Sequence, residues 1–283
     1  MNPYVEIIRP GNVIMAIIAV VLVAILKKSI DIPIILAMLS VFFAMSGGNV
    51  INDYFDYKID LINKPQRPIP SGRISLNKAK KYAEFLFIIA AIIGFIISYL
   101  VNTWIPCAIV LFADIILYLY AYKLKSTPLI GNLTVGFMTG LCFIFAGYSF
   151  NDPSIIYKSY LLAFFALIMT TAREITKDIE DIEGDKSEGA KTFPILYGTK
   201  ISAIIAVSLI IIDCALCPIL YIYHIFNLNY LIIVSIAALI FIYGAILLRN
   251  QDSKTANKVS KYLKIGMLIA FVAFALGTMT ISI

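Results

Sequence analysis

The chain has 283 residues, of which 61% are hydrophobic and only 14% are charged. Soluble globular proteins carry roughly 45–50% apolar and about 25% charged residues, so this composition argues against a soluble enzyme, a disordered protein and a nucleic-acid-binding module. The formal net charge of +6 therefore has to be explained by where the cations lie along a membrane protein.

Nine apolar stretches approach or exceed the length of about 20 residues that a helix needs to cross a bilayer. They cover residues 12–26, 32–57, 77–100, 104–122, 129–150, 155–177, 200–224, 228–248 and 259–282. The sequence therefore predicts an all-α, polytopic membrane protein, and we take residues 1–283 as a single transmembrane domain.

The second stretch ends in a cluster of acidic side chains, Asp53, Asp56 and Asp60, which follows Asn52. On an α-helix these four residues share one arc of about 100°. Carboxylates are costly at the end of a membrane span, and like charges on one arc repel unless a cation lies between them. We therefore predict that Asn52, Asp53, Asp56 and Asp60 bind a metal ion.

A basic turn follows this first cluster. Residues 64–73 contain three prolines and a glycine, which predict a stiff, non-helical connection. Within it, Arg67 and Arg73 have the planar guanidinium that forks onto phosphate oxygens, and Lys64 adds a third cation. The alternative is a basic loop that only contacts lipid headgroups.

The fourth stretch ends in a tyrosine-rich and lysine-rich segment, residues 118–125. At its end, Lys123 and Lys125 add a second group of cations to the same predicted side of the membrane, and Tyr122 directly precedes them. We include these three residues among the candidates for the functional site.

A second acidic cluster, Asp178, Asp181 and Asp185, ends the sixth stretch. The three aspartates share one helical face, whereas Glu180 and Glu183 project to the other side. Four cations flank this cluster along the chain: Arg173, Lys177, Lys186 and Lys191.

Both clusters offer oxygen ligands without a nearby His or Cys, a donor set that favours Mg²⁺ over Ca²⁺ or Zn²⁺. Magnesium commonly joins one or two carboxylates to a substrate phosphate, and Arg and Lys neutralise the remaining charge. The sequence therefore predicts a Mg²⁺–diphosphate site. The competing interpretation is that both clusters are solvated helix ends.

The distribution of Lys and Arg predicts the orientation. With the N-terminus in the cytoplasm, 20 of the 23 Lys and Arg residues fall on the cytoplasmic side and Lys27, Lys28 and Lys158 fall outside. The positive-inside rule thus predicts a cytoplasmic N-terminus, an external C-terminus and a functional face toward the cytoplasm.

Taken together, these motifs resemble the UbiA superfamily of intramembrane prenyltransferases. The motifs are Asn52-x-x-x-Asp56-x-x-x-Asp60, the Lys64–Arg73 turn and Asp178-x-x-Asp181-x-x-x-Asp185. The pair of aspartate motifs is specific, whereas either one alone is not. The resemblance implies nine transmembrane helices around a central cavity, a cytoplasmic cap, and Mg²⁺-dependent transfer of a prenyl group from its diphosphate to an acceptor.

Within the superfamily, residues 6–12, 120–125 and 184–192 are most similar to the archaeal branch that makes ether lipids. That branch transfers a geranylgeranyl group from geranylgeranyl diphosphate to geranylgeranylglyceryl phosphate and so forms the second ether bond. The resemblance implies membrane lipid and these two substrates as partners. The composition and the distribution of cations argue against nucleic acid, and no protein partner is evident from the sequence.

The resemblance also implies roles for single residues. It points to Asp56, Asp181, Lys125 and Tyr122 as catalytic. The side chains that it implies for binding substrate phosphate are Arg9, Asn12, Lys64, Arg67, Arg73, Lys123, Lys125, Arg173, Lys177, Lys186 and Lys191. A Tyr-x-x-x-Lys element of the family is not matched in its strict spacing, because Leu119 and Ala121 stand four residues before the two lysines.

Two other functions compete with this one. A related prenyltransferase with an aromatic acceptor, a quinone precursor or a tetrapyrrole, would not require a second phosphate-binding patch. A membrane transporter would place its acidic site near the middle of the bilayer. The position of both clusters at span ends favours the enzyme.

Overall fold

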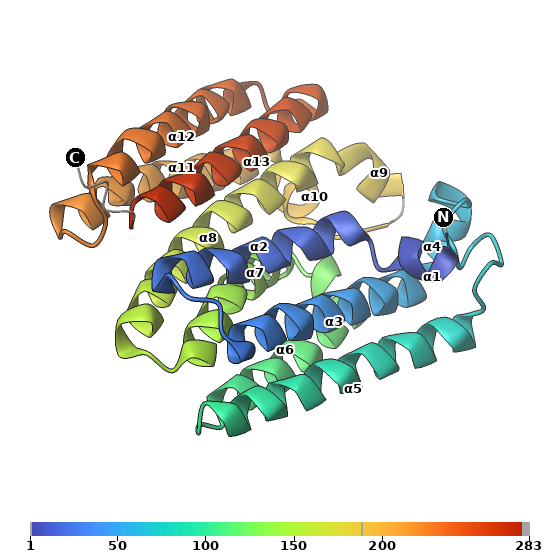
Figure 1. The fold of residues 1–283 in the computed structure, drawn as a ribbon. Coiled ribbons are helices and arrows are strands. Elements are labelled where there is room, and N and C mark those ends of the chain that lie inside the picture. The colour runs from blue at the N-terminus through green and yellow to red at the C-terminus, as the bar shows by residue number, and fades with distance from the viewer. Residues whose placement is uncertain (1, 188, 279–283) are drawn as a thin grey trace. The chain divides into compact units, whose positions relative to one another are not determined.

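The computed structural model describes residues 2–187 and 189–278, and every regular element in these two ranges is a helix (Figure 1). Nine helices there are long and apolar enough to span a membrane: α2 (Pro10–Lys27), α3 (Ile32–Phe55), α5 (Leu76–Leu100), α6 (Ile105–Tyr122), α7 (Ile130–Phe150), α8 (Pro153–Glu180), α11 (Thr199–Ile222), α12 (Leu228–Leu247) and α13 (Ser253–Leu276). The shorter helices are α1 (Pro3–Ile7), α4 (Tyr57–Asn63), η1 (Leu124–Ser126), α9 (Ile182–Ser187), α10 (Phe193–Tyr197) and η2 (Leu248–Asn250). The prediction of nine spans is confirmed.

The helix that differs most from its predicted bounds is α13. It begins at Ser253 rather than at residue 259, because the Asp252 side chain accepts a hydrogen bond from the backbone N–H of Thr255 at 2.8 Å and caps the helix. The cap adds a polar turn that hydropathy alone does not recognise. The predicted end of this span, residues 279–282, lies outside the described residues.

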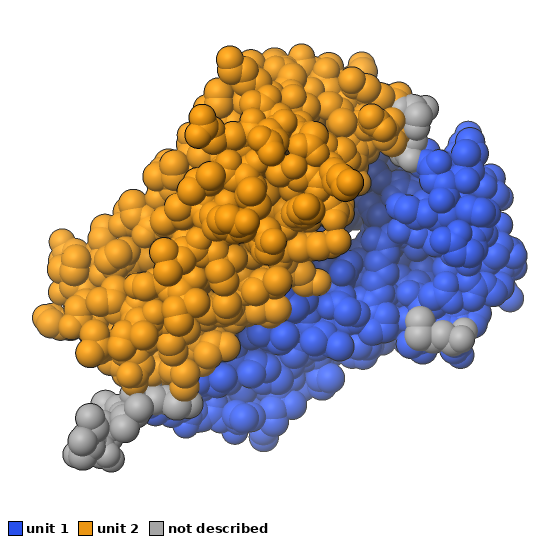
Figure 2. Space-filling model, turned by 90° about the horizontal axis from the view of Figure 1, so that it is seen from above, with its two compact units in different colours: residues 1–125, 138–163 blue, residues 126–137, 164–283 orange. Residues whose placement is uncertain are grey.

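The chain forms two compact units, shown in different colours in Figure 2. Unit 1 comprises Met1–Lys125 and Met138–Ala163, and unit 2 comprises Ser126–Phe137 and Phe164–Ile283. The first aspartate cluster belongs to unit 1 and the second to unit 2.

In unit 1, helix α3 lies at the centre and packs against α2, α5 and α6 (Figure 1). Two adjacent glycines allow the close approach: a Cβ at Gly47 would lie 2.9 Å from the Phe87 ring, and one at Gly48 would lie 3.0 Å from Leu117. Small residues serve this purpose in membrane helices, where van der Waals contact rather than exclusion of water holds the helices together. The position of α3 fixes the first aspartate cluster at its end.

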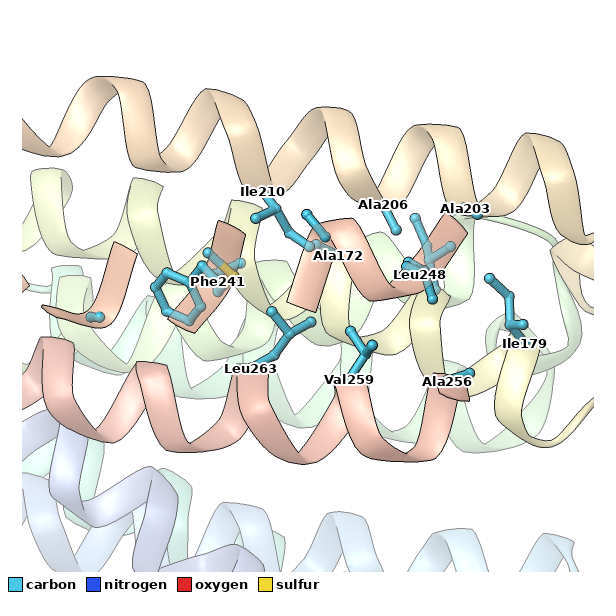
Figure 3. Close-up of a cluster of buried hydrophobic side chains, with 14 residues drawn as sticks. Ala172, Ile179, Ala203, Ala206, Ile210, Phe241, Leu248, Ala256, Val259 and Leu263 are labelled. Carbon is cyan, nitrogen blue, oxygen red and sulfur yellow. The ribbon is translucent and has the colours of Figure 1, made fainter. Parts of the chain in front are cut away.

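Unit 2 is built around α11, α12 and α13. Figure 3 shows Ile210 of α11, Phe241 of α12 and Leu263 of α13 gathered in one apolar cluster. Ile175 and Ile179, near the end of α8, belong to the same buried cluster. This packing holds the helix end that carries the second group of aspartates.

Candidate active site

The first aspartate cluster follows one helical path across the junction of α3 and α4. Asp56 lies between the two helices, its N–H donates to the carbonyl of Asn52 at 3.0 Å, and the N–H of Asp60 donates to the carbonyl of Asp56 at 2.8 Å. These bonds have the i to i−4 pattern of an α-helix, so the helical phase on which the predicted shared face depends continues through the junction.

Cationic side chains from three separate segments engage the carboxylates of this cluster. Arg9 donates to Asp53, and Lys125 donates to Asp56. Arg67 bridges two aspartates, with Nη1 3.2 Å from Asp53 Oδ1 and 2.6 Å from Asp60 Oδ2. Asp53 and Asp60 are only 3% and 2% exposed. Carboxylates this buried need charged partners, which explains why the cations converge here.

Phe55, the residue directly before Asp56, packs its ring against two tyrosines. The ring of Phe55 is 5.5 Å from that of Tyr118 and 5.4 Å from that of Tyr122, both on α6. Asn52 Nδ2 also donates to Asp56 Oδ2 at 3.0 Å. The structure thus pairs Asp56 with Lys125 and packs Tyr122 against Phe55, the residue before Asp56. Asp56, Lys125 and Tyr122 are three of the four residues for which the family resemblance implies a catalytic role.

Arg73, another candidate in unit 1, is bound to the carboxylate of Glu6. Arg73 forms a bidentate pair with Glu6, with Nη1 2.6 Å from Oε2 and Nη2 2.9 Å from Oε1. This hydrogen bonding lowers the pKa of Glu6 below its ordinary value. The side chains of Asn12, Lys64 and Lys123 are exposed.

The second cluster repeats the arrangement of the first. Asp181 separates α8 from α9, its N–H donates to the carbonyl of Lys177 at 2.9 Å, and the N–H of Asp185 donates to the carbonyl of Asp181 at 2.9 Å. The helical phase therefore continues here too. Asn132 of α7 donates from Nδ2 to Asp178 Oδ2 at 2.8 Å.

The neighbouring acidic side chains of unit 2 have other partners. The Glu180 carboxylate accepts a hydrogen bond from Asn257, and the backbone carbonyl of Glu180 accepts one from the Ser253 hydroxyl, so this residue joins α8 to the start of α13. Glu174 pairs with Arg173 at 2.9 Å and with Lys177 at 3.1 Å. The side chains of Lys186 and Lys191 are exposed.

The chemistry of both clusters fits a divalent cation bound together with a phosphate. Within residues 2–187 and 189–278, no three His, Cys, Asp or Glu side chains are grouped so that they hold a metal ion by themselves. Magnesium typically takes one or two carboxylates and completes its shell with water and phosphate oxygens. The oxygen-only donors therefore fit Mg²⁺, and Arg9, Arg67 and Lys125 are side chains of the kind that bind phosphate.

Comparison with known proteins decides the family. The profile described as the UbiA prenyltransferase family matches residues 12–279. The chain belongs to the UbiA prenyltransferase family. Because it also carries nine membrane-length helices in its described part, this UbiA prenyltransferase is a multi-pass membrane enzyme.

Two curated relatives of this UbiA prenyltransferase match over their full length. It is 86% identical to the digeranylgeranylglyceryl phosphate synthase of Methanobrevibacter smithii, covering 100% of both chains. It is 52% identical to the enzyme of the same name from Methanosphaera stadtmanae, covering 99% of this chain and 100% of the relative.

Solved structures give the same fold. A structure from work on digeranylgeranylglyceryl phosphate synthase in membranes is 40% identical, with a TM-score of 0.83 over 98% of this chain and 97% of that one. A UbiA homolog from Archaeoglobus fulgidus, bound to GPP and Mg²⁺, is 18% identical, with a TM-score of 0.69 over 96% of this chain and 99% of that one. At that identity the second structure shows the shared fold alone.

Sequence reasoning did not identify two buried amides beside the site of this UbiA prenyltransferase. Asn132 is 7% exposed and holds Asp178; Asn49 is 6% exposed and donates to the carbonyl of Ile8 at 2.7 Å. The sequence feature that could have identified them is an amide side chain within an apolar span, where a polar group without a hydrogen-bond partner is costly. That signal predicts a partner without saying which one.

Proposed function

We propose that the chain transfers a geranylgeranyl group from geranylgeranyl diphosphate to geranylgeranylglyceryl phosphate and forms the second ether bond of archaeal membrane lipids. The observation that carries the proposal is the network in which Arg9, Arg67 and Lys125 converge on three aspartates of one helical run. Carboxylates for a metal ion and cations for phosphate are thereby placed within one cluster. Full-length similarity to relatives named for this reaction supports the choice of substrates.

The two aspartate clusters are the proposed Mg²⁺ ligands, with Asn52, Asp53, Asp56 and Asp60 in the first and Asp178, Asp181 and Asp185 in the second. Bound Mg²⁺ would neutralise negative charge that grows on the diphosphate as it leaves. We assign Arg67 and Lys177 to the prenyl diphosphate. Arg73, Lys123 and Lys125 are assigned to the phosphate of the acceptor.

The side chains around Asp56 supply the rest of the chemistry in this proposal. As the allylic C–O bond breaks, the electron pair leaves with the diphosphate and the allylic carbon gains cationic character. The π-faces of Phe55 and Tyr122 stabilise that cation. The acceptor hydroxyl then attacks the carbon to form the ether bond and passes its proton to the departing diphosphate. Exclusion of water by the membrane prevents formation of the free alcohol.

The proposal extends to the whole chain. Residues 1–283 act as one prenyltransferase domain, a view supported by the continuous family match over residues 12–279. The N-terminus and the functional face are cytoplasmic and the C-terminus is external, as the distribution of cations favours. The central cavity and the cytoplasmic cap implied by the family belong to the same proposal.

An acceptor panel tests the proposed reaction. Purified protein is given geranylgeranyl diphosphate with geranylgeranylglyceryl phosphate, with its dephosphorylated form, or with an aromatic quinone precursor, and products are analysed by mass. Efficient reaction with the phosphorylated lipid alone supports the proposal. An equal rate with the dephosphorylated lipid would contradict a binding pocket for the acceptor phosphate. A higher rate with the aromatic compound would favour the alternative function, a prenyltransferase with an aromatic acceptor.

A further inference from the structure

The joint between α1 and α2 carries Arg9 in an unusual backbone conformation. Arg9 has φ 52° and ψ 71°, in the left-handed region that non-glycine residues rarely adopt. Pro10 follows directly and begins α2. Strained residues of this kind persist only where the surrounding structure holds them, and they concentrate at functional sites.

Asn49 of α3 holds this joint. Its side chain is buried, and Nδ2 donates to the carbonyl oxygen of Ile8 at 2.7 Å, on the residue directly before Arg9. Ile7 and Ile8 are buried in the same apolar cluster as Val50 and Ile51 of α3. The backbone on the N-terminal side of Arg9 is therefore fixed to α3 by both packing and a hydrogen bond.

Asn49 also lies one helical turn before Asp53 on α3, so the two side chains share a face of the helix. The backbone of Ile8 is bound at the first of these residues, and the Arg9 side chain donates to the second. On its other side, α1 is tied by Glu6 to Arg73 of the basic turn. The Asn49–Ile8 hydrogen bond, the Arg9–Asp53 pair and the Glu6–Arg73 pair together fix the position of the Arg9 guanidinium.

We propose that Asn49 is a positioning residue: by binding the Ile8 carbonyl, it keeps Arg9 in the left-handed conformation that directs its guanidinium to Asp53. The part of this inference that concerns substrate rests on the proposed function. Arg9 shares Asp53 Oδ1 with Arg67, which is assigned there to the prenyl diphosphate, so we assign Arg9 to the same substrate. A residue that only satisfies a buried polar group would contribute to stability without affecting Arg9.

The first test is independent of activity. Asn49→Leu keeps the approximate size of the side chain and removes the donor, and Asn49→Ala serves if that variant folds poorly. Ser40→Ala is the matched control, because Ser40 makes another buried hydrogen bond from α3 to a backbone carbonyl, that of Ala90 at 3.1 Å. Hydrogen–deuterium exchange of residues 3–13 should accelerate in the Asn49 variant and remain unchanged in the control.

The second test uses turnover. Asn49→Leu should raise KM for geranylgeranyl diphosphate about tenfold, as expected when a charge-assisted contact is misplaced, with KM for the acceptor nearly unchanged. In the double variant, Asn49→Leu should raise KM for geranylgeranyl diphosphate little beyond the value of Arg9→Ala alone. The effects of two residues that act through one contact are not additive.

Unchanged hydrogen–deuterium exchange in residues 3–13 would overturn the positioning role. A double variant whose increase in KM equals the product of the increases in the two single variants would overturn it as well. If wild-type protein forms no product while exchange still accelerates in Asn49→Leu, the proposed function fails and the structural role of Asn49 stands. The two claims are therefore separable.

Discussion

The carboxylate of Asp56 binds both Asn52 and Lys125 at the junction of α3 and α4, so a change at this residue removes the centre of the first cluster. We predict that Asp56→Ala abolishes turnover while the protein still inserts and folds. Loss of a proposed metal ligand should cost several kcal/mol of transition-state stabilisation, at least about a hundredfold in kcat/KM. Product formation and the thermal unfolding midpoint in detergent are measured on the same preparation.

Glu183 provides the matched control for this prediction in the second cluster. It is exposed on α9 and projects away from the aspartate face, so Glu183→Ala should keep most of the activity, whereas Asp181→Ala should be inactive. Equal loss in both variants would show that the shared helical face does not determine which carboxylates act.

The pair between Glu6 and Arg73 should make stability depend on pH. Hydrogen bonding from Arg73 lowers the pKa of Glu6 from its ordinary value of 4.5, so the ionised form is favoured in the folded chain. The stabilisation is therefore complete above about pH 4.5 and is lost as the pH falls through the lowered pKa. Glu6→Gln should lower the unfolding midpoint at pH 7, and this difference should shrink as the pH falls through the lowered pKa of Glu6. A difference that stays constant with pH would contradict this assignment.

At the scale of elements, the packing of α7 against α8 in unit 2 depends on a glycine. A Cβ at Gly136 would lie 2.6 Å from the carbonyl oxygen of Leu167, a backbone atom that cannot move aside. Gly136→Val should destabilise the protein by about 1–3 kcal/mol, the usual cost of overpacking. Gly11→Ala is the control, since nothing lies within 4 Å of its Cβ position. Equal unfolding midpoints for both variants would show that this helix pair tolerates separation.

The membrane-length helices could be predicted because each depends on a local run of apolar residues. For eight of the nine, both the first and the last residue lie close to the predicted ones. The start of α13 could not be predicted from hydropathy, because it depends on the Asp252 side chain that caps the helix. Contacts such as Asn132 with Asp178, 46 residues apart, arise only from helix packing. Sequence periodicity places a side chain on a face but does not identify the helix opposite.

At the scale of the whole molecule, the charge pattern and the family match agree on a membrane enzyme that handles anionic substrates. Twenty of 23 cations fall on one predicted side, and the family profile spans residues 12–279. The residues that the sequence singled out as acidic and basic also meet in unit 1 as ion pairs. The proposed reaction therefore requires that divalent metal and these residues together activate a prenyl diphosphate.

The most direct test of that claim is product formation from radiolabelled geranylgeranyl diphosphate and geranylgeranylglyceryl phosphate by the purified protein, with Mg²⁺ and with excess EDTA. We predict labelled digeranylgeranylglyceryl phosphate with Mg²⁺, its loss in EDTA and its recovery when Mg²⁺ is restored. Product formation that continues undiminished in excess EDTA, or no labelled product when Mg²⁺ is present, would contradict it.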